Sequence, residues 1–179
     1  MKTTSNCHNI IRLLEVFENN RYVFFVLEYA QNGDLLKYVK NKSKLSESTA
    51  KRIFADIVIG LISIHGKNVL HRDIKLDNIL LDENFRPKIC DFGVSRFMIN
   101  EEIISEQCGT PAYIAPEIID ENGYSGFTAD IWSLGVLLYA MTTGSMPFRA
   151  NSIEELHKHI LDVDFQIPKE LNLSDSLHD

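Results

Sequence analysis

A change in hydrophobic periodicity near residue 45 constrains the fold of this chain most strongly. Before it, residues 13–17 and 22–27 are short β-rich runs joined by Asn19-Asn20, a pattern that predicts an antiparallel hairpin. After it, apolar residues recur at helical spacing from Ser46, a candidate N-cap, to Gly66, which ends the run. The sequence therefore predicts an α+β fold in which a small β segment leads into a mainly helical body.

Further elements are expected beyond this long helix. Residues 79–81 and 87–90 predict a short hairpin, and residues 129–141 predict a second apolar helix. A shorter helix is expected to begin at Ser152, where Glu155 completes a capping box.

Composition limits the classes of protein to which the chain can belong. Of 179 residues, 45% are hydrophobic and 24% are charged, which is ordinary for one globular domain. A formal charge of −7 argues against a general nucleic-acid binder. The most apolar stretch, residues 131–141, is too short to span a bilayer, so no membrane segment is expected. Cys7, Cys90 and Cys108 form no CxxC pair, which fits reduced thiols and predicts a cytoplasmic, or also nuclear, protein.

Polar side chains crowd the stretch from His71 to Asn78, directly after the long helix. Phosphoryl transfer from a nucleotide needs a carboxylate that orients the attacking hydroxyl, a cation near the moving group, and oxygen ligands for Mg²⁺. Asp73, Lys75 and Asn78 can supply these in that order. Asp91, followed by Phe92-Gly93, can chelate the metal that bridges the phosphates. Each fragment alone reads as an ordinary loop or turn, so the inference depends on their order and spacing.

Three later motifs complete the pattern: Gly109-Thr110-Pro111, Ala115-Pro116-Glu117 and Asp130-Ile131-Trp132-Ser133-Leu134-Gly135. With them the chain resembles the eukaryotic protein kinases, from about Asn6 to its last residue. The stretch from Asp91 to Glu117 is most similar to the calcium/calmodulin-dependent and AMP-activated branch. The resemblance implies a protein-kinase-like fold and a Ser/Thr protein kinase that uses ATP and Mg²⁺.

The resemblance also implies roles for individual residues. Asp73 would be the catalytic base, Lys75 the cation that marks Ser/Thr kinases, and Thr110 the residue that positions both. Asn78 and Asp91 would hold the metal. The expected nucleotide-site residues are Leu27 as gatekeeper, Glu28 and Ala30 of the hinge, and Asp34, Asp77 and Leu80.

Other implied roles concern the scaffold and the substrate. Asp130 would anchor the catalytic loop, and the hydrophobic stack between the lobes would include His71, Phe92 and Leu13. Asp34 and Asp77 fall where many basophilic kinases carry acidic residues for substrate arginines. This implies a protein substrate with a Ser or Thr acceptor and an upstream basic residue, although Ala140 replaces another acidic residue that some of these kinases use.

The chain departs from the family pattern at both ends. The 179 residues contain no glycine-rich phosphate loop, no ATP-clamping strand lysine and no partner glutamate for it. We therefore expect a partial kinase domain: residues 1–27 a remnant hairpin of the N lobe, 28–34 the hinge, and 35–179 a C lobe that is incomplete at its end. The alternative is a catalytically impaired fragment that acts as a protein-interaction module. A small-molecule phosphotransferase of this fold is disfavoured by the Ala115-Pro116-Glu117 motif.

One acidic residue lies where the resembling branch carries its regulatory threonine. Glu106 is two residues before Cys108, and we expect its carboxylate to pair with Arg72 in place of a phosphate. In the other interpretation, Glu106 is a solvated loop residue and Ser105 is the phosphorylated site.

Overall fold

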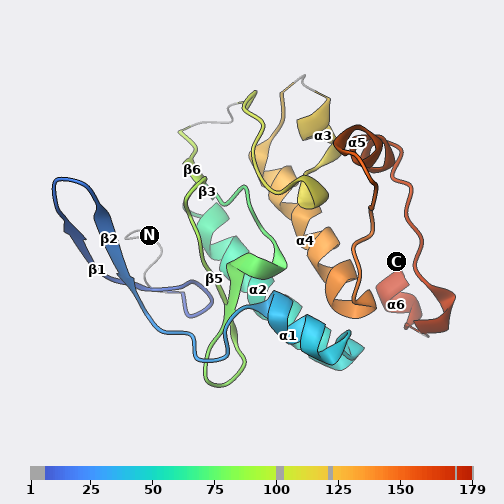
Figure 1. The fold of residues 1–179 in the computed structure, drawn as a ribbon, viewed down its shortest axis with the longest axis horizontal. Helices are drawn as coiled ribbons and strands as arrows, with labels where there is room; N and C mark the ends of the chain where they lie inside the picture. The colour runs from blue at the N-terminus through green and yellow to red at the C-terminus, as the bar shows by residue number, and fades with distance from the viewer. Residues whose placement is uncertain (1–6, 100–102, 121–122, 172, 179) are drawn as a thin grey trace.

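The computed structural model describes residues 7–99, 103–120, 123–171 and 173–178. Its helices are α1 (Leu35–Lys42), α2 (Glu47–His65), α3 (Pro116–Ile119), α4 (Gly126–Thr143), α5 (Ile153–Leu161) and α6 (Asp175–His178). Its strands are β1 (Leu13–Glu18), β2 (Val23–Leu27), β3 (Val69–Leu70), β4 (Ile79–Leu81), β5 (Pro87–Ile89) and β6 (Arg96–Phe97). Short 3₁₀ turns are η2 (Leu76–Asn78), η3 (Pro111–Tyr113) and η4 (Lys169–Leu171). The predicted α+β arrangement is confirmed: the hairpin projects from one end of a mainly helical body (Figure 1).

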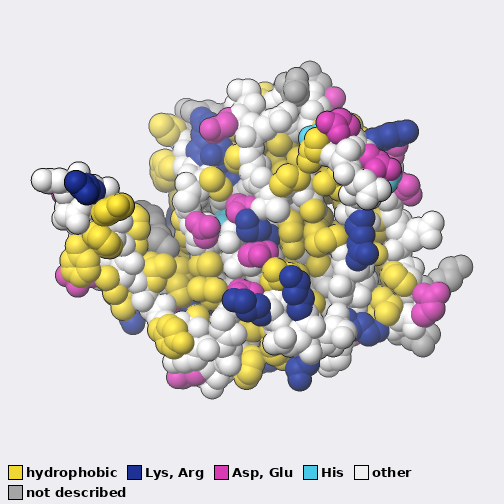
Figure 2. Space-filling model, viewed as in Figure 1, with side chains coloured by type: hydrophobic (Ala, Val, Ile, Leu, Met, Phe, Trp, Pro, Cys, Tyr) yellow, Lys and Arg dark blue, Asp and Glu magenta, His cyan; other side chains and the backbone are white. Residues whose placement is uncertain are grey.

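The β1–β2 hairpin is antiparallel, as predicted. Its turn is held by the Asn19 side chain, whose oxygen accepts from the backbone N–H groups of Arg21 and Tyr22, each at 2.9 Å. Every side chain of β2 is exposed. Figure 2 shows apolar side chains along this arm.

The long predicted helix is confirmed as α2. The Ser46 hydroxyl accepts from the Thr49 N–H at its start, and Gly66 is the C-cap. The residues that this helix buries lie on one face, at helical spacing; they are Ala50, Ile53, Ile57, Gly60, Leu61 and Ile64. They pack into the core with residues of α4 and β5.

Other predicted elements differ at their edges or were missed. Helix α4 begins three residues before the predicted residue 129 and ends two residues after residue 141. Its C-terminal end is set by Gly144, which has a left-handed conformation (φ 74°), and not by the end of the apolar pattern. Helix α5 has the predicted Ser152 cap, but the Glu155 carboxylate accepts from Asn151 N–H instead of Ser152 N–H. The β4–β5 pair is confirmed, whereas the β3–β6 pair and α1 were not predicted.

A close backbone approach fixes the segment before β1 to the helical body. Ile89 N–H donates to the Asn9 carbonyl at 2.8 Å, and Ile11 N–H donates to the Ile89 carbonyl at 2.8 Å. On Gly60 of α2, a Cβ would lie 2.9 Å from that Asn9 oxygen, so any larger residue would force this segment outward. The chain entering β1 is thereby held beside β5, the strand that leads to Asp91.

No helix in the part of the chain that the structure describes has the length and apolar character needed to cross a membrane.

Candidate active site

A buried carboxylate of α4 holds the backbone of the loop that follows β3. Asp130 is 1% exposed and accepts from His71 N–H at 3.0 Å, from Arg72 N–H at 2.8 Å, and from His65 Nε2 at 2.8 Å. Arg72 has φ 66°, a conformation that costs energy for a residue with a side chain. The Asp130 contacts compensate for that cost and set the direction in which Asp73 leaves the loop.

His71 occupies the centre of this loop as a neutral imidazole. Its Nε2 donates to the Cys90 carbonyl at 2.9 Å, and Asp73 N–H donates to its Nδ1 at 3.3 Å. Burial lowers the pKa of His71 and outweighs the nearby carboxylates. Its ring lies 5.0 Å from that of Phe92, and Phe92 lines the same cleft as Leu13. Of the three expected members of the hydrophobic stack, His71 and Phe92 therefore lie side by side, and Leu13 lines the cleft that Phe92 also lines.

Four polar side chains that were predicted as site residues converge on one point. The Asp73 carboxylate accepts from Thr110 Oγ1 at 2.8 Å, from Asn78 Nδ2 at 2.9 Å, and from Lys75 Nζ at 2.8 Å. Lys75 Nζ also donates to Thr110 Oγ1 at 2.8 Å. Thr110 thus accepts from the ammonium and donates to the carboxylate, which holds the two charged groups at a fixed spacing.

The protonation state of Asp73 follows from these contacts. Burial raises its pKa, but the hydrogen bonds from Lys75, Thr110 and Asn78 outweigh burial and leave the pKa below its usual value. At neutral pH, Asp73 is therefore a carboxylate that can accept a proton or a hydroxyl hydrogen bond. The adjacent ammonium of Lys75, 21% exposed, can face a transferred anion.

The two expected metal ligands are connected through the backbone. Asn78 Nδ2 donates to the Asp73 carbonyl and carboxylate, so the oxygen on the other side of its planar amide faces away from Asp73. Cys90 N–H donates to the Asn78 carbonyl at 2.9 Å, and Asp91 follows with φ 59°. One amide and one carboxylate oxygen suit Mg²⁺, which takes few protein ligands and completes its shell with water and phosphate oxygens. Within the described ranges, no cluster of three His, Cys, Asp or Glu side chains suits a metal ion, so a site with more protein ligands is not seen.

An open cleft of about 530 Å³ lies between the hairpin and the loop that begins at Asp91. It is lined by Leu13, Phe25, Leu27, Asp91, Phe92, Gly93 and Ser95. Leu27, the expected gatekeeper, and Asp91, an expected metal ligand, thus line the same cleft.

The remaining nucleotide-site candidates lie around the connection from β2 to α1. The Glu28 carboxylate accepts from Arg12 N–H at 2.7 Å and from Lys88 Nζ at 3.2 Å, so its side chain holds the start of this connection to β5. The Ala30 carbonyl accepts from Gly33 N–H at 3.3 Å, and Leu80 is half-buried on β4.

The two acidic candidates have different surroundings. Asp34 is the N-cap of α1, forms a β-bridge with Leu80, and is paired with Lys37 at 2.9 Å. Asp77 is exposed on η2.

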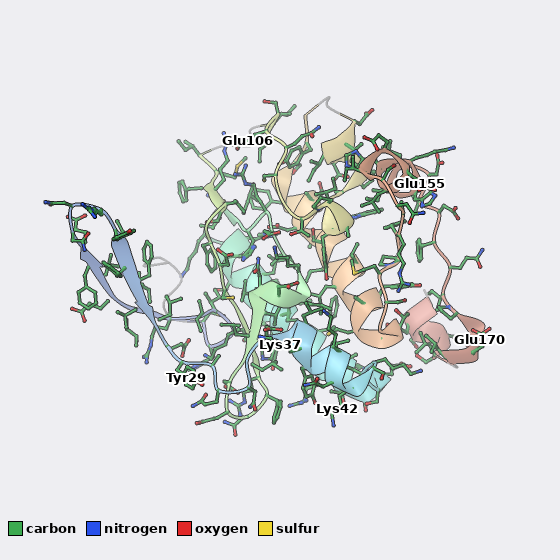
Figure 3. All side chains as sticks on the ribbon, viewed as in Figure 1. Tyr29, Lys37, Lys42, Glu106, Glu155 and Glu170 are labelled. Atoms are coloured by element: carbon green, nitrogen blue, oxygen red, sulfur yellow. The ribbon has the colours of Figure 1, made fainter. Side chains whose placement is uncertain are left out.

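The expected contact between Arg72 and Glu106 is present. Arg72 Nη1 lies 2.8 Å from Glu106 Oε2, and Arg72 Nε donates to the Val94 carbonyl at 2.7 Å. Tyr124 Oη donates to the Glu106 carbonyl at 2.9 Å. The Arg72 side chain is 10% exposed and that of Glu106 is 64% exposed, so a largely buried cation pairs with an exposed anion. Figure 3 shows Glu106 on the segment that follows β6. Hydrogen bonding to Arg72 lowers the pKa of Glu106.

The sequence analysis did not identify two residues of the site region. His65 joins the last turn of α2 to Asp130, and Lys88 donates to Glu28 and to the His8 carbonyl at 2.8 Å. These pairs are separated by 65 and 60 residues, respectively, so no local pattern indicates them.

Comparison with known proteins assigns this arrangement to a family. The profile described as "Protein kinase domain" matches residues 1–179. CBL-interacting protein kinase 11 of Oryza sativa subsp. japonica is 38% identical over 175 residues, covering 95% of this chain and 35% of the relative. CBL-interacting serine/threonine-protein kinase 5 of Arabidopsis thaliana is 40% identical over 163 residues, 89% of this chain and 36% of the relative. A serine/threonine-protein kinase SIK3 homolog of Danio rerio is 38% identical over 168 residues, 94% of this chain and 14% of the relative. The chain thus spans little more than a third, or less, of these relatives.

Proposed function

The chain belongs to the protein kinase domain family, and from that premise we propose that it transfers the γ-phosphoryl group of ATP to a Ser or Thr hydroxyl of a protein substrate. The expected kinase-like fold agrees with this membership. The observation that carries the proposal is the cluster of Asp73, Lys75, Thr110 and Asn78, held together by hydrogen bonds of 2.8–2.9 Å.

The cluster fits the two requirements of transfer to an alcohol. The low pKa of Asp73 keeps its carboxylate ionised, so it can orient the hydroxyl and accept its proton as the new P–O bond forms. Lys75, fixed by Thr110, places a positive charge where negative charge moves between donor and acceptor. Neither side chain needs to reorganise, because both are already held in the ground state.

Nucleotide and metal would bind on the cleft side of this cluster. We assign the adenine edge to the backbone of Glu28 and Ala30, with Leu27 and Leu80 as apolar neighbours and Asp34 and Asp77 near the ribose side. We assign Mg²⁺ to the Asn78 amide oxygen and the Asp91 carboxylate; when bound, it would neutralise charge on the phosphates. Cys7, Cys90 and Cys108 are free thiols, which supports a cytoplasmic location.

The second candidate function is a protein-interaction module without turnover. It is favoured by the hairpin, where all five side chains of β2 are exposed, including Phe24 at 48% and Phe25 at 62%. Exposed apolar surface of this kind commonly marks a contact with another protein.

A transfer assay separates the two candidates. Purified protein is incubated with Mg²⁺, γ-labelled ATP and peptides that differ only in carrying Ser, Thr or Tyr as acceptor. The kinase proposal expects label on Ser and Thr peptides, and none with the Asp73→Asn variant as control. Label on no peptide would favour the interaction module, and label on Tyr alone would overturn the role given to Lys75.

A further inference from the structure

Positive charge is concentrated on α1 and the start of α2, although the protein as a whole is acidic. From residue 34 to residue 52 the chain has six Lys or Arg residues and two carboxylates, a net charge of +4, whereas the whole chain carries −7. The remaining residues therefore carry −11. We call the six cations, all of which are exposed, the α1 basic surface; they are Lys37, Lys40, Lys42, Lys44, Lys51 and Arg52.

The fold turns these cations away from the core. Helix α1 buries Leu35 and Val39, and at 3.6 residues per turn Lys37 and Lys40 lie on its outer side. Figure 2 shows Lys and Arg side chains gathered over α1, and Figure 3 shows Lys37 near the start and Lys42 near the end of this helix. The cations therefore face solvent together on one part of the molecule.

The two carboxylates of this stretch already have partners. Asp34 accepts from Lys37 N–H at 2.8 Å as the helix cap and pairs with Lys37 Nζ at 2.9 Å. Glu47 accepts from the backbone N–H of Ser174 at 3.0 Å and from its hydroxyl. The Asp34 side chain is 19% exposed and that of Lys37 is 78% exposed, so an approaching molecule meets the ammonium before the carboxylate.

The composition of this surface indicates what kind of anion it suits. Among the described residues 30–58, no large apolar side chain is exposed. The surface therefore has neither an apolar anchor for a protein partner nor an exposed ring on which a nucleic-acid base could stack. Five of its six cations are lysines, which are flexible, hydrated point charges. Such charges suit a fluid layer of lipid headgroups better than a shaped binding site.

The acidic remainder of the protein does not prevent this contact. At physiological ionic strength, exposed charges more than about 8 Å apart are largely screened from each other. An anionic layer that touches α1 is therefore attracted by the nearby lysines and is repelled only weakly by distant carboxylates.

We propose that the α1 basic surface binds the headgroup layer of an anionic lipid bilayer and holds the protein there by electrostatic attraction, without insertion. About four to eight Lys or Arg residues on an exposed helix are typical of attachment to phosphatidylserine-containing membranes. The inference goes beyond the proposed function, since it requires neither ATP nor catalysis.

Vesicle sedimentation tests the proposal. The 179-residue protein is mixed with vesicles of phosphatidylcholine, or with vesicles that also contain about 30% phosphatidylserine, at about 0.1 M salt. It should pellet only with the phosphatidylserine vesicles. Raising the salt to about 0.5 M should weaken that binding at least about tenfold, because the attraction is screened.

A pair of variants identifies the surface. Lys40→Gln with Lys42→Gln should lower the partition coefficient about 25-fold, since each lysine close to an anionic bilayer contributes about fivefold. Arg149→Gln with Lys158→Gln removes the same charge from exposed positions at and beside α5, which lies on the other side of the body (Figure 1), and should leave binding unchanged.

A second pair guards against a folding defect. Lys40 and Lys42 lie in the last turn of α1, where cations also stabilise the helix end, so thermal melting is recorded for each variant. Lys51→Gln with Arg52→Gln removes two cations from α2 instead, and should weaken vesicle binding by a similar factor.

Four outcomes would overturn the inference. The first is equal binding to both kinds of vesicle, which would indicate apolar contact through the β1–β2 hairpin. The second is binding to neither, and the third is an equal loss in the α5 control and the α1 variant. The fourth is retention of a short single-stranded RNA without pelleting on phosphatidylserine vesicles, which would assign the surface to nucleic acid.

These outcomes are independent of the proposed function. A protein that labels Ser and Thr peptides but binds no vesicle would contradict the inference and leave the kinase proposal intact. A protein that binds phosphatidylserine vesicles through α1 but labels no peptide would contradict the kinase proposal and leave the inference intact.

Discussion

Replacing Thr110 with valine removes one hydroxyl from the site and changes the shape of the side chain little. That hydroxyl donates to Asp73 at 2.8 Å and accepts from Lys75 at 2.8 Å. A hydrogen bond to a charged group contributes roughly 1.5–3 kcal/mol. Asp73 and Lys75 are 13% and 21% exposed, so water can replace one of the two bonds, and a total loss of about 1.5–3 kcal/mol is expected. This corresponds to about 10- to 150-fold in kcat.

Two measurements on Thr110→Val check this reasoning. In steady-state assays kcat should fall while KM for ATP changes little, because Thr110 contacts the transfer groups and does not line the open cleft. Hydrogen bonding by Thr110 helps to lower the pKa of Asp73, so its removal raises that pKa and shifts the acid limb of the pH–kcat profile to higher pH. Thr110→Ser keeps the hydroxyl and should retain most of the activity. A Thr110→Val enzyme within twofold of wild type would refute the bridging role.

Three further outcomes are expected. Glu106→Gln in unphosphorylated protein should lower activity about two- to fivefold, since an exposed ion pair with Arg72 contributes little, and Ser105→Ala should not; the reverse pattern would contradict the fixed-charge interpretation. Cys90 should resist a thiol-reactive nucleotide-site reagent at about pH 8, because burial raises its thiol pKa to about 12; rapid modification that ATP blocks, seen by mass spectrometry, would argue against this. Asp91→Asn should weaken ATP binding about tenfold in calorimetry with Mg²⁺ and little without it; equal losses in both titrations would exclude Asp91 as a metal ligand.

The elements that local patterns determine were predicted well. Ser46 and Gly66 delimit α2 because capping and apolar spacing are properties of neighbouring residues. Helix α1 was missed because the Asp34 carboxylate was interpreted as a substrate contact, although it caps the helix. The β3–β6 pair has two residues in each strand, and such short strands exist only through pairing with a distant segment. Local periodicity contains no information about that pairing.

The site was predictable to the extent that the family resemblance supplied long-range information. Nothing in spacing alone brings Thr110 to Asp73 across 37 residues, or Glu106 to Arg72 across 34. The motif order supplied the first pair, and the position of the activation-segment threonine supplied the second.

The central claim is that Asp73 acts on the acceptor hydroxyl and not on the nucleotide. It is tested most directly by measuring, on the same preparations of wild type and Asp73→Asn, the dissociation constant for ATP with Mg²⁺ and the single-turnover rate of transfer to a Ser peptide. The account predicts nearly equal dissociation constants and a transfer rate at least about 100-fold lower in the variant. A variant that transfers phosphate at near wild-type rate, or one that loses transfer only because it no longer binds ATP, would contradict it.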